Sequence, residues 1–278
     1  MAETPAVRTG GCVTLAAGLF AVVATALPVT AQTAGEGDAE LAQTLSNPVA
    51  ALISVPLQLN YDRGFGADAG HVWRLNVQPV VPIRFSGDWN LISRTIVPLT
   101  YQNDIAPGAG SQYGLGDTLQ SAFLSPVEPT SGGWIWGAGP VVLLPTATDD
   151  LLGGEKWAAG PTAVVLRQDS GWTYGALANH LWSFAGDGNR ADINATFVQP
   201  FLSYTTQDAW TLNLNTETTY NWDESEWSVP INFAVSKLTR IEGQAVSIGA
   251  GARYWAASSE GGPDGVGFRL TFTLLFPK

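Results

Sequence analysis

The stretch Gly267–Phe276 alternates large apolar side chains with polar or small ones almost to the end of the chain. Successive side chains of a β-strand point to opposite faces, so this stretch would form a strand with one apolar and one polar face. Its apolar face carries Phe268, Leu270, Phe272, Leu274 and Phe276, and its polar face carries Arg269, Thr271 and Thr273. A terminal strand of this kind, ending on an aromatic residue, is typical of the closing strand of a transmembrane β-barrel.

Extended segments of this type, separated by turn-forming residues, follow one another through the chain. They are Val49–Tyr61, His71–Phe85, Trp89–Gln102, Tyr113–Ser125, Gly133–Leu144, Trp157–Arg167, Trp172–Phe184, Ile193–Thr205, Trp210–Trp222, Trp227–Leu238, Ala245–Ala256 and Gly265–Phe276. Their length of roughly 11–15 residues exceeds the average soluble strand and suffices for a tilted strand to cross a bilayer. The sequence therefore predicts an all-β fold, a transmembrane antiparallel up-and-down β-barrel of about 12 strands.

The connections between the segments alternate between short and long. Ser86–Asp88 and Asp169–Gly171 are tight turns, whereas Asp104–Gln112 and Ala185–Asp192 are longer loops. Short periplasmic turns opposite longer external loops are typical of outer-membrane barrels. The alternative is a secreted soluble β-sandwich, because alternation alone does not say whether lipid or a protein core meets the apolar faces. The low proportion of charged residues, 13% against about 25% in soluble domains, favours the barrel.

Residues 1–31 have the organisation of a signal peptide. Arg8 precedes an apolar run over Val13–Leu27, and Val29–Ala31 matches a cleavage site. Cleavage near Ala31 would leave a mature chain that begins near Gln32. These features predict export, and with the barrel they predict location in the outer membrane.

Residues 32–48 are interpreted as a periplasmic lead-in or a short plug, with a turn or two of helix at Glu40–Leu45, and residues 49–278 as the barrel. The only cysteine, Cys12, lies within the expected signal peptide. The mature chain is therefore expected to have neither disulfides nor thiolate metal sites.

Tryptophans stand at the ends of several predicted strands. Trp89, Trp172 and Trp210 directly follow tight turns, while Trp222 and Trp227 lie at the opposite strand ends. Because tryptophan favours the membrane–water interface, these five residues are predicted to anchor the barrel at the two interfaces.

Acidic side chains gather in and near the long loops of a chain whose net charge is -11. They include Asp62, Asp68, Asp104, Asp149, Asp150, Glu155, Asp187, Asp192, Asp223, Glu224, Glu226, Glu260 and Asp264. The simplest interpretation is a solvated outer surface, and the alternative is bridging of divalent cations to anionic lipid or steering of cationic solutes. The negative charge argues against nucleic acid as a partner.

Charged residues inside the predicted strands should face the lumen, because an arginine that faces lipid at mid-membrane costs about 2–4 kcal/mol. The candidates for lining or constricting the lumen are Arg74, Arg84, Arg94, Asp117, Glu217, Arg253 and Arg269. They would either pair across the lumen as struts or form a constriction that filters solutes. A barrel of this size is narrower than a porin, so the expected channel is narrow.

Prolines interrupt the predicted strands, and each removes a hydrogen bond of the ladder. They are Pro56, Pro79, Pro82, Pro98, Pro140, Pro161, Pro200 and Pro230. A closed barrel has no free edge to accommodate them, so bulges or inward kinks are predicted there.

Several runs carry a resemblance to a known family. They are Asn47–Pro56, Trp89–Thr95, Gly114–Thr118, Leu144–Asp150, Ala178–Phe184 and Leu274–Lys278. In them the chain resembles bacterial outer-membrane transporters related to the phenol-degradation-pathway (MetA-pathway) barrel family, and the resemblance covers essentially the whole mature chain. It implies a monomeric barrel that passes small compounds, hydrophobic or aromatic ones among them, and it brings no catalytic residues.

No motif for catalysis or for a cofactor stands out. Gly64–Gly66 lacks the strand-to-helix context of a phosphate-binding loop. The two histidines, His71 and His180, are too few for a multi-histidine metal site. An outer-membrane hydrolase would need a serine–histidine pair on one face, whereas His180 and Ser183 are three residues apart on one strand and would point to opposite faces. We therefore expect no enzyme, cofactor or metal.

Two functions remain. The first is a passive channel for small solutes, whose other partners would be outer-membrane lipids and the barrel-assembly machinery acting on the C-terminal strand. The second is a non-conducting structural barrel that acts through its acidic external loops.

Overall fold

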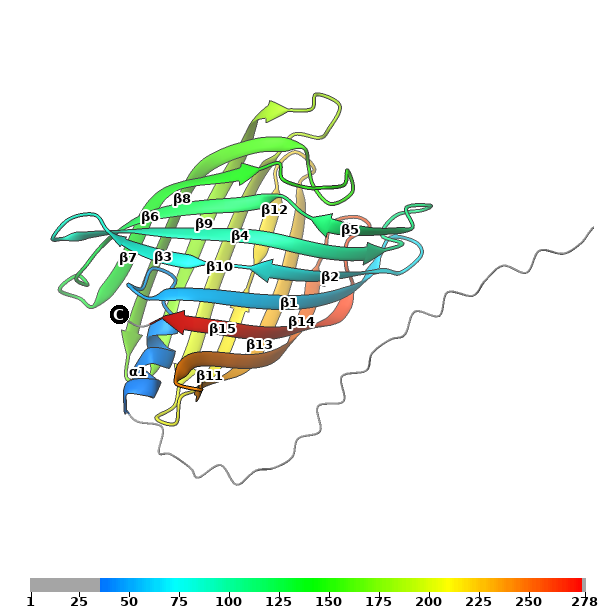
Figure 1. Cartoon of the computed structure of the whole chain (residues 1–278). Helices are drawn as coiled ribbons and strands as arrows, with labels where there is room; N and C mark the ends of the chain where they lie inside the picture. The colour runs from blue at the N-terminus through cyan, green and yellow to red at the C-terminus, as the bar shows by residue number, and fades with distance from the viewer. Residues whose placement is uncertain (1–35, 277–278) are drawn as a thin grey trace, which may run out of the picture. The chain divides into compact units, whose positions relative to one another are not determined.

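The computed structural model describes residues 36–276; the expected signal peptide and its cleavage site lie outside this range. Its elements are α1 (Glu36–Leu45), β1 (Ile53–Phe65), β2 (Gly70–Val77), β3 (Val80–Arg84), β4 (Trp89–Asn103), β5 (Ser111–Leu115), β6 (Thr118–Pro126), β7 (Trp134–Leu144), β8 (Lys156–Asp169), β9 (Trp172–Gly186), β10 (Asn194–Thr205), β11 (Trp210–Thr216), β12 (Thr218–Asn221), β13 (Glu226–Ile241), β14 (Gln244–Ala257) and β15 (Gly265–Phe276). Neighbouring strands pair antiparallel, and β1 pairs with β15, so the sheet closes into a barrel (Figure 1). Within residues 36–276, no helix is long and apolar enough to cross a membrane.

Three strands of the barrel are each interrupted once. β2 and β3 pair with the same two neighbours, β1 and β4, and β11 and β12 both pair with β10 and β13. β5 and β6 both pair with β4. Each interrupted pair is one strand of the wall, which gives the predicted antiparallel barrel of 12 strands.

Two of these interruptions face a proline of a neighbouring strand. The backbone N–H of Gln78 donates to the carbonyl of Pro56 at 2.8 Å, and that of Glu217 donates to the carbonyl of Pro230 at 3.3 Å. Proline has no N–H to return the bond, so the regular ladder lapses at both places. The third interruption, at Asp117, shifts the register with β4 by one residue. The irregularities predicted at Pro56 and Pro230 are therefore present.

The barrel has two distinct ends. The turn end carries the connections 85–88, 127–133, 170–171, 206–209 and 242–243, together with α1 and the end of β15 (Figure 1). The loop end carries the connections 66–69, 104–110, 145–155, 187–193, 222–225 and 258–264. The connections at the loop end are longer on the whole than those at the turn end, as predicted. Two of them, 66–69 and 222–225, are as short as the turns.

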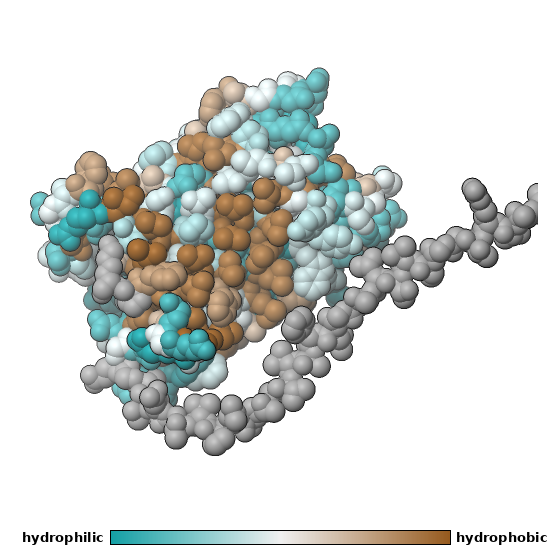
Figure 2. Space-filling model, viewed as in Figure 1, coloured by the Kyte–Doolittle hydropathy of each residue, from teal (hydrophilic) through white to brown (hydrophobic). Residues whose placement is uncertain are grey.

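The outer face of the barrel is apolar. Leu212 and Leu214 on β11 are 40% and 47% exposed, whereas Thr211 between the turn and Leu212 is buried. Apolar side chains gather across the middle of the face seen in Figure 2, and hydrophilic ones lie nearer both ends. This distribution is the reverse of that in a soluble protein, and so extensive an exposed apolar surface requires an apolar partner.

The segment before β1 packs into the turn end of the barrel. Ala42 of α1 is buried in a cluster with Leu238 of β13 and Leu275 of β15. Val49 is buried in a second cluster that lies among inward-facing side chains of the wall. The strand begins only at Ile53, so its predicted start at Val49 was wrong. Val49, Ala50 and Leu52 bury their side chains without joining the sheet, and Ala51 is exposed.

Candidate functional site

A cavity of about 760 Å³ occupies the interior of the barrel. Ala42, Leu45 and Ser46 of the N-terminal segment line it from the turn end, and Glu217 and Arg269 line it deeper in the barrel. Its volume lies within the range of roughly 300–1,000 Å³ that is usual for small-molecule sites. The interior is thus large enough to hold an organic solute.

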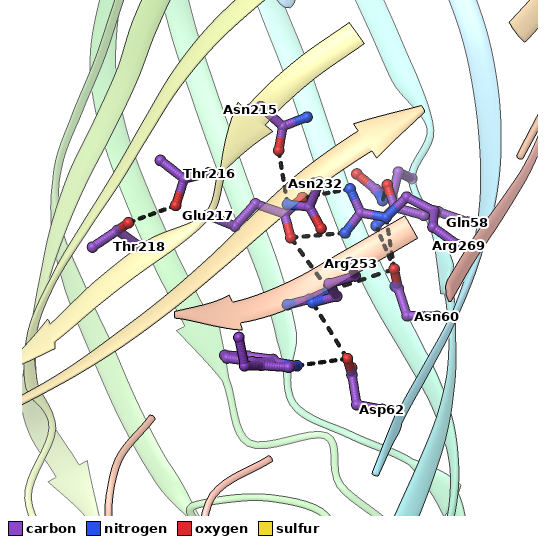
Figure 3. A network of polar contacts seen from close by, with 12 residues as sticks. Gln58, Asn60, Asp62, Asn215, Thr216, Glu217, Thr218, Asn232, Arg253 and Arg269 are labelled. Atoms are coloured by element: carbon purple, nitrogen blue, oxygen red, sulfur yellow. Dashed lines mark hydrogen bonds and ion pairs between the residues drawn. The ribbon is translucent and has the colours of Figure 1, made fainter. Parts of the chain in front are cut away.

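Four charged side chains form a cluster inside the barrel, shown in Figure 3. Arg269 donates to both carboxylate oxygens of Glu217, with Nη1–Oε1 and Nη2–Oε2 distances of 2.9 and 2.8 Å. Arg253 lies 3.5 Å from Glu217 and 3.4 Å from Asp62, measured between the nearest charged atoms. Both arginine side chains are at least nine-tenths buried. The cluster contains two arginines and two carboxylates, so its formal charges cancel.

Neutral groups hold this cluster in place. The Asn60 side-chain oxygen accepts a hydrogen bond from Arg269 Nε at 2.7 Å, and Asp62 accepts one from Trp255 Nε1 at 2.8 Å. The Arg253 guanidinium also lies 4.6 Å from the centre of the Trp255 ring, at cation–π distance. The residues of the cluster are therefore fixed on several sides at once.

Strand register explains why these residues meet. Asn60 of β1 pairs with Arg269 of β15, and Gly267 of β15 pairs with Arg253 of β14. A Cβ atom on Gly267 would lie 2.9 Å from Asp62 Oδ1 and would also collide with the carbonyl oxygen of Tyr61. The glycine thus leaves room for the carboxylate of Asp62 beside Arg253.

Asp62 was not among the predicted lumen residues. It was interpreted as part of the acidic loop surface, because the first strand was expected to end at Tyr61. β1 continues to Phe65, so Asp62 is a buried member of the ion-pair cluster. The signal was present in the sequence: Gln58, Asn60 and Asp62 continue one polar face at the period of a strand.

Arg74 and Arg94 also line the cavity, and neither forms an ion pair with a carboxylate of the described residues. Arg94 donates to the Gln78 side chain at 3.0 Å. Arg74 is exposed toward the cavity, and within residues 36–276 its side chain has no hydrogen bond or ion pair. The four arginines face two carboxylates, so two positive charges remain uncompensated in this part of the lumen.

The structure does not bring the other two predicted lumen residues to the cavity. Arg84 lies exposed at the end of β3 and donates to the carbonyl oxygens of Ser86 and Gly87 in the adjoining turn. Asp117 accepts hydrogen bonds from the backbone N–H groups of Ala147 and Gly154, at 3.2 and 2.7 Å. Arg84 thus fastens a turn and Asp117 fastens the 145–155 loop, because both lie near strand ends or interruptions.

The five predicted anchor tryptophans lie at strand ends. Trp172, Trp210, Trp222 and Trp227 are about half exposed on the outer face, and Trp89 is half-buried against a neighbouring tryptophan. Trp89, Trp172 and Trp210 mark the turn end, and the other two the loop end. Their place at a lipid–water interface remains a prediction.

His180 and Ser183 do not form a catalytic pair. The Nδ1 atom of His180 lies 2.7 Å from the hydroxyl of Thr196, while Ser183 donates to Asp192 at 3.1 Å. Trp182, which shares the face of His180, is exposed on the outside of the barrel. In the part of the chain that the structure describes, no three His, Cys, Asp or Glu side chains come together as a metal site.

Solved structures share this fold. An outer membrane channel from Pseudomonas putida is similar with a TM-score of 0.64 and 13% sequence identity, over 81% of this chain and 96% of that chain. Outer membrane phospholipase A from Escherichia coli is similar with a TM-score of 0.50 and 9% identity, over 81% of this chain and 90% of that chain. No protein-family model matches the sequence, and no curated protein matches it either. These similarities establish an outer-membrane type of β-barrel and leave the relation to the phenol-degradation-pathway family a prediction.

Proposed function

We propose that this protein is a passive outer-membrane channel for small solutes. The observation that carries the proposal is the contrast between the two faces of one closed wall: apolar side chains outside, and inside a cavity whose lining includes charged, amide and hydroxyl side chains. A closed barrel satisfies all its backbone groups in lipid, and a polar interior is suited to water and solutes.

The proposed orientation follows the usual arrangement of outer-membrane barrels. The turn end, with α1, would face the periplasm, and the longer acidic loops would face the exterior. The chain would be exported with cleavage near Ala31, and the assembly machinery would act on β15. One copy closes the barrel, which supports a monomer surrounded by outer-membrane lipid.

Charge inside the barrel is expected to set the ionic preference. Asp62 and Glu217 neutralise Arg253 and Arg269, so Arg74 and Arg94 dominate the potential along the cavity. Charges that line a narrow, low-dielectric passage raise the local concentration of ions of opposite sign. The channel should therefore favour anions, although the whole chain is acidic.

One observation favours the alternative of a non-conducting barrel. α1 and Val49 occupy the turn end of the interior, and Asp38 of α1 is held by Arg240 of β13 at 2.8 Å. A plug fixed in this way would leave a structural barrel that acts through its acidic loops. We favour the channel because a cavity of about 760 Å³ remains beside Ala42, Leu45 and Ser46 of this segment.

Single-channel recording of the purified mature protein in planar bilayers tests the proposal. We expect small, reproducible conductance steps whose size changes in the Arg94→Ala variant. Unboiled samples should also run anomalously in SDS gels, as closed barrels do. A well-folded, heat-modifiable barrel that never conducts would overturn the channel and support the structural alternative.

A further inference from the structure

The cavity has two chemically different walls. On one side of the cavity, β2, β1, β15, β13 and β11 contribute mainly arginine, amide and hydroxyl side chains, whereas the arc of wall from β4 to β10 contributes most of the large apolar ones. These apolar side chains are Ile96, Leu119, Leu143, Leu177, Leu181 and Phe197, and Ser121, Asn179 and Gln199 lie among them. This apolar surface does not favour small hydrated ions, because water interacts weakly with apolar side chains. It would favour a solute that has apolar surface of its own.

The uncompensated arginines lie at the seam between these walls. Arg94 and Ile96 share the inward face of β4, two residues apart, and Arg74 lies on the neighbouring β2. A carboxylate held by Arg94 would therefore have Ile96 directly beside it, whereas Arg74 pairs with Thr100 and lies further along the wall. Arginine suits this task, because its planar guanidinium donates two parallel hydrogen bonds to a carboxylate.

We propose that the cavity binds small monocarboxylates with an apolar body, aromatic or short aliphatic. The carboxylate lies at Arg94, and the body lies against the wall that contains Leu119. This inference rests on the proposed channel for the solute's route, but the binding site itself is defined by the cavity. The carboxylate and the apolar body of the solute both contribute to its binding free energy, so a solute with only one of them should bind more weakly.

Calorimetric titration of the refolded mature protein in detergent, with benzoate as the probe, tests the binding. Acetate keeps the charge and lacks the body, and benzyl alcohol keeps the body and lacks the charge. We expect benzoate to bind at least about tenfold more tightly than either, the ratio that roughly one good contact supplies. Equal binding of benzoate and acetate, or of benzoate and benzyl alcohol, would overturn the proposal.

Three variants locate the site. Arg94→Gln should weaken benzoate about tenfold, and Arg94→Lys should restore part of the loss because it returns the charge. Leu119→Asn should weaken benzoate and leave acetate unchanged. Arg84→Gln is the matched control, since Arg84 is on the neighbouring strand β3 but outside the cavity, and it should bind like the wild type. A loss in Arg84→Gln equal to that in Arg94→Gln would place the effect elsewhere and contradict the site.

The same titration separates this inference from the proposed function. Benzoate binding by a barrel that never conducts would refute the channel and keep the site. Anion-selective conductance without a preference for benzoate would keep the channel and refute the site. Block of the ionic current by benzoate, relieved in Arg94→Gln, would support both.

Discussion

Arg269 and Glu217 form a bidentate ion pair inside the barrel, although two strands of the wall, β13 and β14, separate the strands that carry them. The pair spans the curvature of the interior and is joined by Arg253 at 3.5 Å. A carboxylate shared by two buried arginines fixes three segments of the wall relative to one another. It also removes these arginines from the charge available to solutes, so the ionic preference depends on Arg74 and Arg94.

Removing the shared carboxylate should both destabilise the barrel and change its selectivity. In Glu217→Gln, Arg253 and Arg269 lose a partner while they remain buried, which costs about 3 kcal/mol or more. We expect a lower urea midpoint for unfolding from lipid vesicles, together with a stronger preference for anions. Glu128→Gln, on an exposed turn-end connection, is the control and should change neither. Unchanged stability in Glu217→Gln would show that the cluster is not a strut.

Adding a methyl group between two members of the cluster should have a related effect. Gly267→Ala places a Cβ atom 2.9 Å from Asp62 Oδ1, so the carboxylate must move away from Arg253. We expect a loss of about 1–3 kcal/mol of stability, the usual range for overpacking. Gly188→Ala lies in open space and should be neutral in the same unfolding assay. Equal behaviour of the two variants would contradict the account of Gly267.

The helix at the turn end should limit conduction. Ala42 is buried in a cluster with Leu238 and Leu275, so the much larger indole of Ala42→Trp would overpack this contact, and α1 should leave its site. We predict larger single-channel conductance for Ala42→Trp than for the wild type. Glu40→Ala, on the exposed side of α1, should conduct like the wild type. A conductance that α1 displacement does not change would show that the passage runs elsewhere.

Acid should loosen the 187–193 loop. Hydrogen bonds from Lys156 and Ser183, at 2.9 and 3.1 Å, lower the pKa of Asp192 below its ordinary value. A group whose pKa is lowered by folding contributes stability above its unfolded pKa and loses it as the pH falls through the folded value. We therefore expect faster pepsin cleavage in this loop below about pH 4, with a modest effect because Asp192 is solvent-exposed.

Asp192→Asn separates this contact from the general action of acid. The variant lacks the titrating group, so its loop should be cleaved at the rate seen in acid at every pH that pepsin tolerates. Asp150→Asn, in the neighbouring loop, should keep the pH dependence of the wild type. If Asp192→Asn also keeps it, another group controls the loop.

The period-two pattern predicted much of the fold and part of the site. It placed Arg74, Arg94, Glu217, Arg253 and Arg269 on inward faces before any register was known, because each lies on the polar face of an alternating strand. It could not predict which of them pair. The partner of Arg269 lies 52 residues away on a strand that does not touch β15, and only closure of the barrel brings the two together.

The sequence does not predict the strand ends, where alternation gives no information. Asp62 belongs to β1, which continues past its predicted end at Tyr61, and Val49 lies in the interior ahead of the strand. By alternation Arg84 is on the inward-facing side of β3. It lies so near the turn that its hydrogen-bond partners are backbone carbonyls. In each case the tertiary position of a strand end decided the role, and local sequence does not encode that position.

The most direct test of the account is the reversal potential of the wild-type channel in a planar bilayer with unequal KCl concentrations on the two sides. Two uncompensated arginines in the lumen predict a reversal potential displaced toward that of chloride, and a smaller displacement in the Arg74→Gln variant. A reversal potential displaced toward that of potassium would contradict the proposed charge of the lumen and, with it, the account of selectivity.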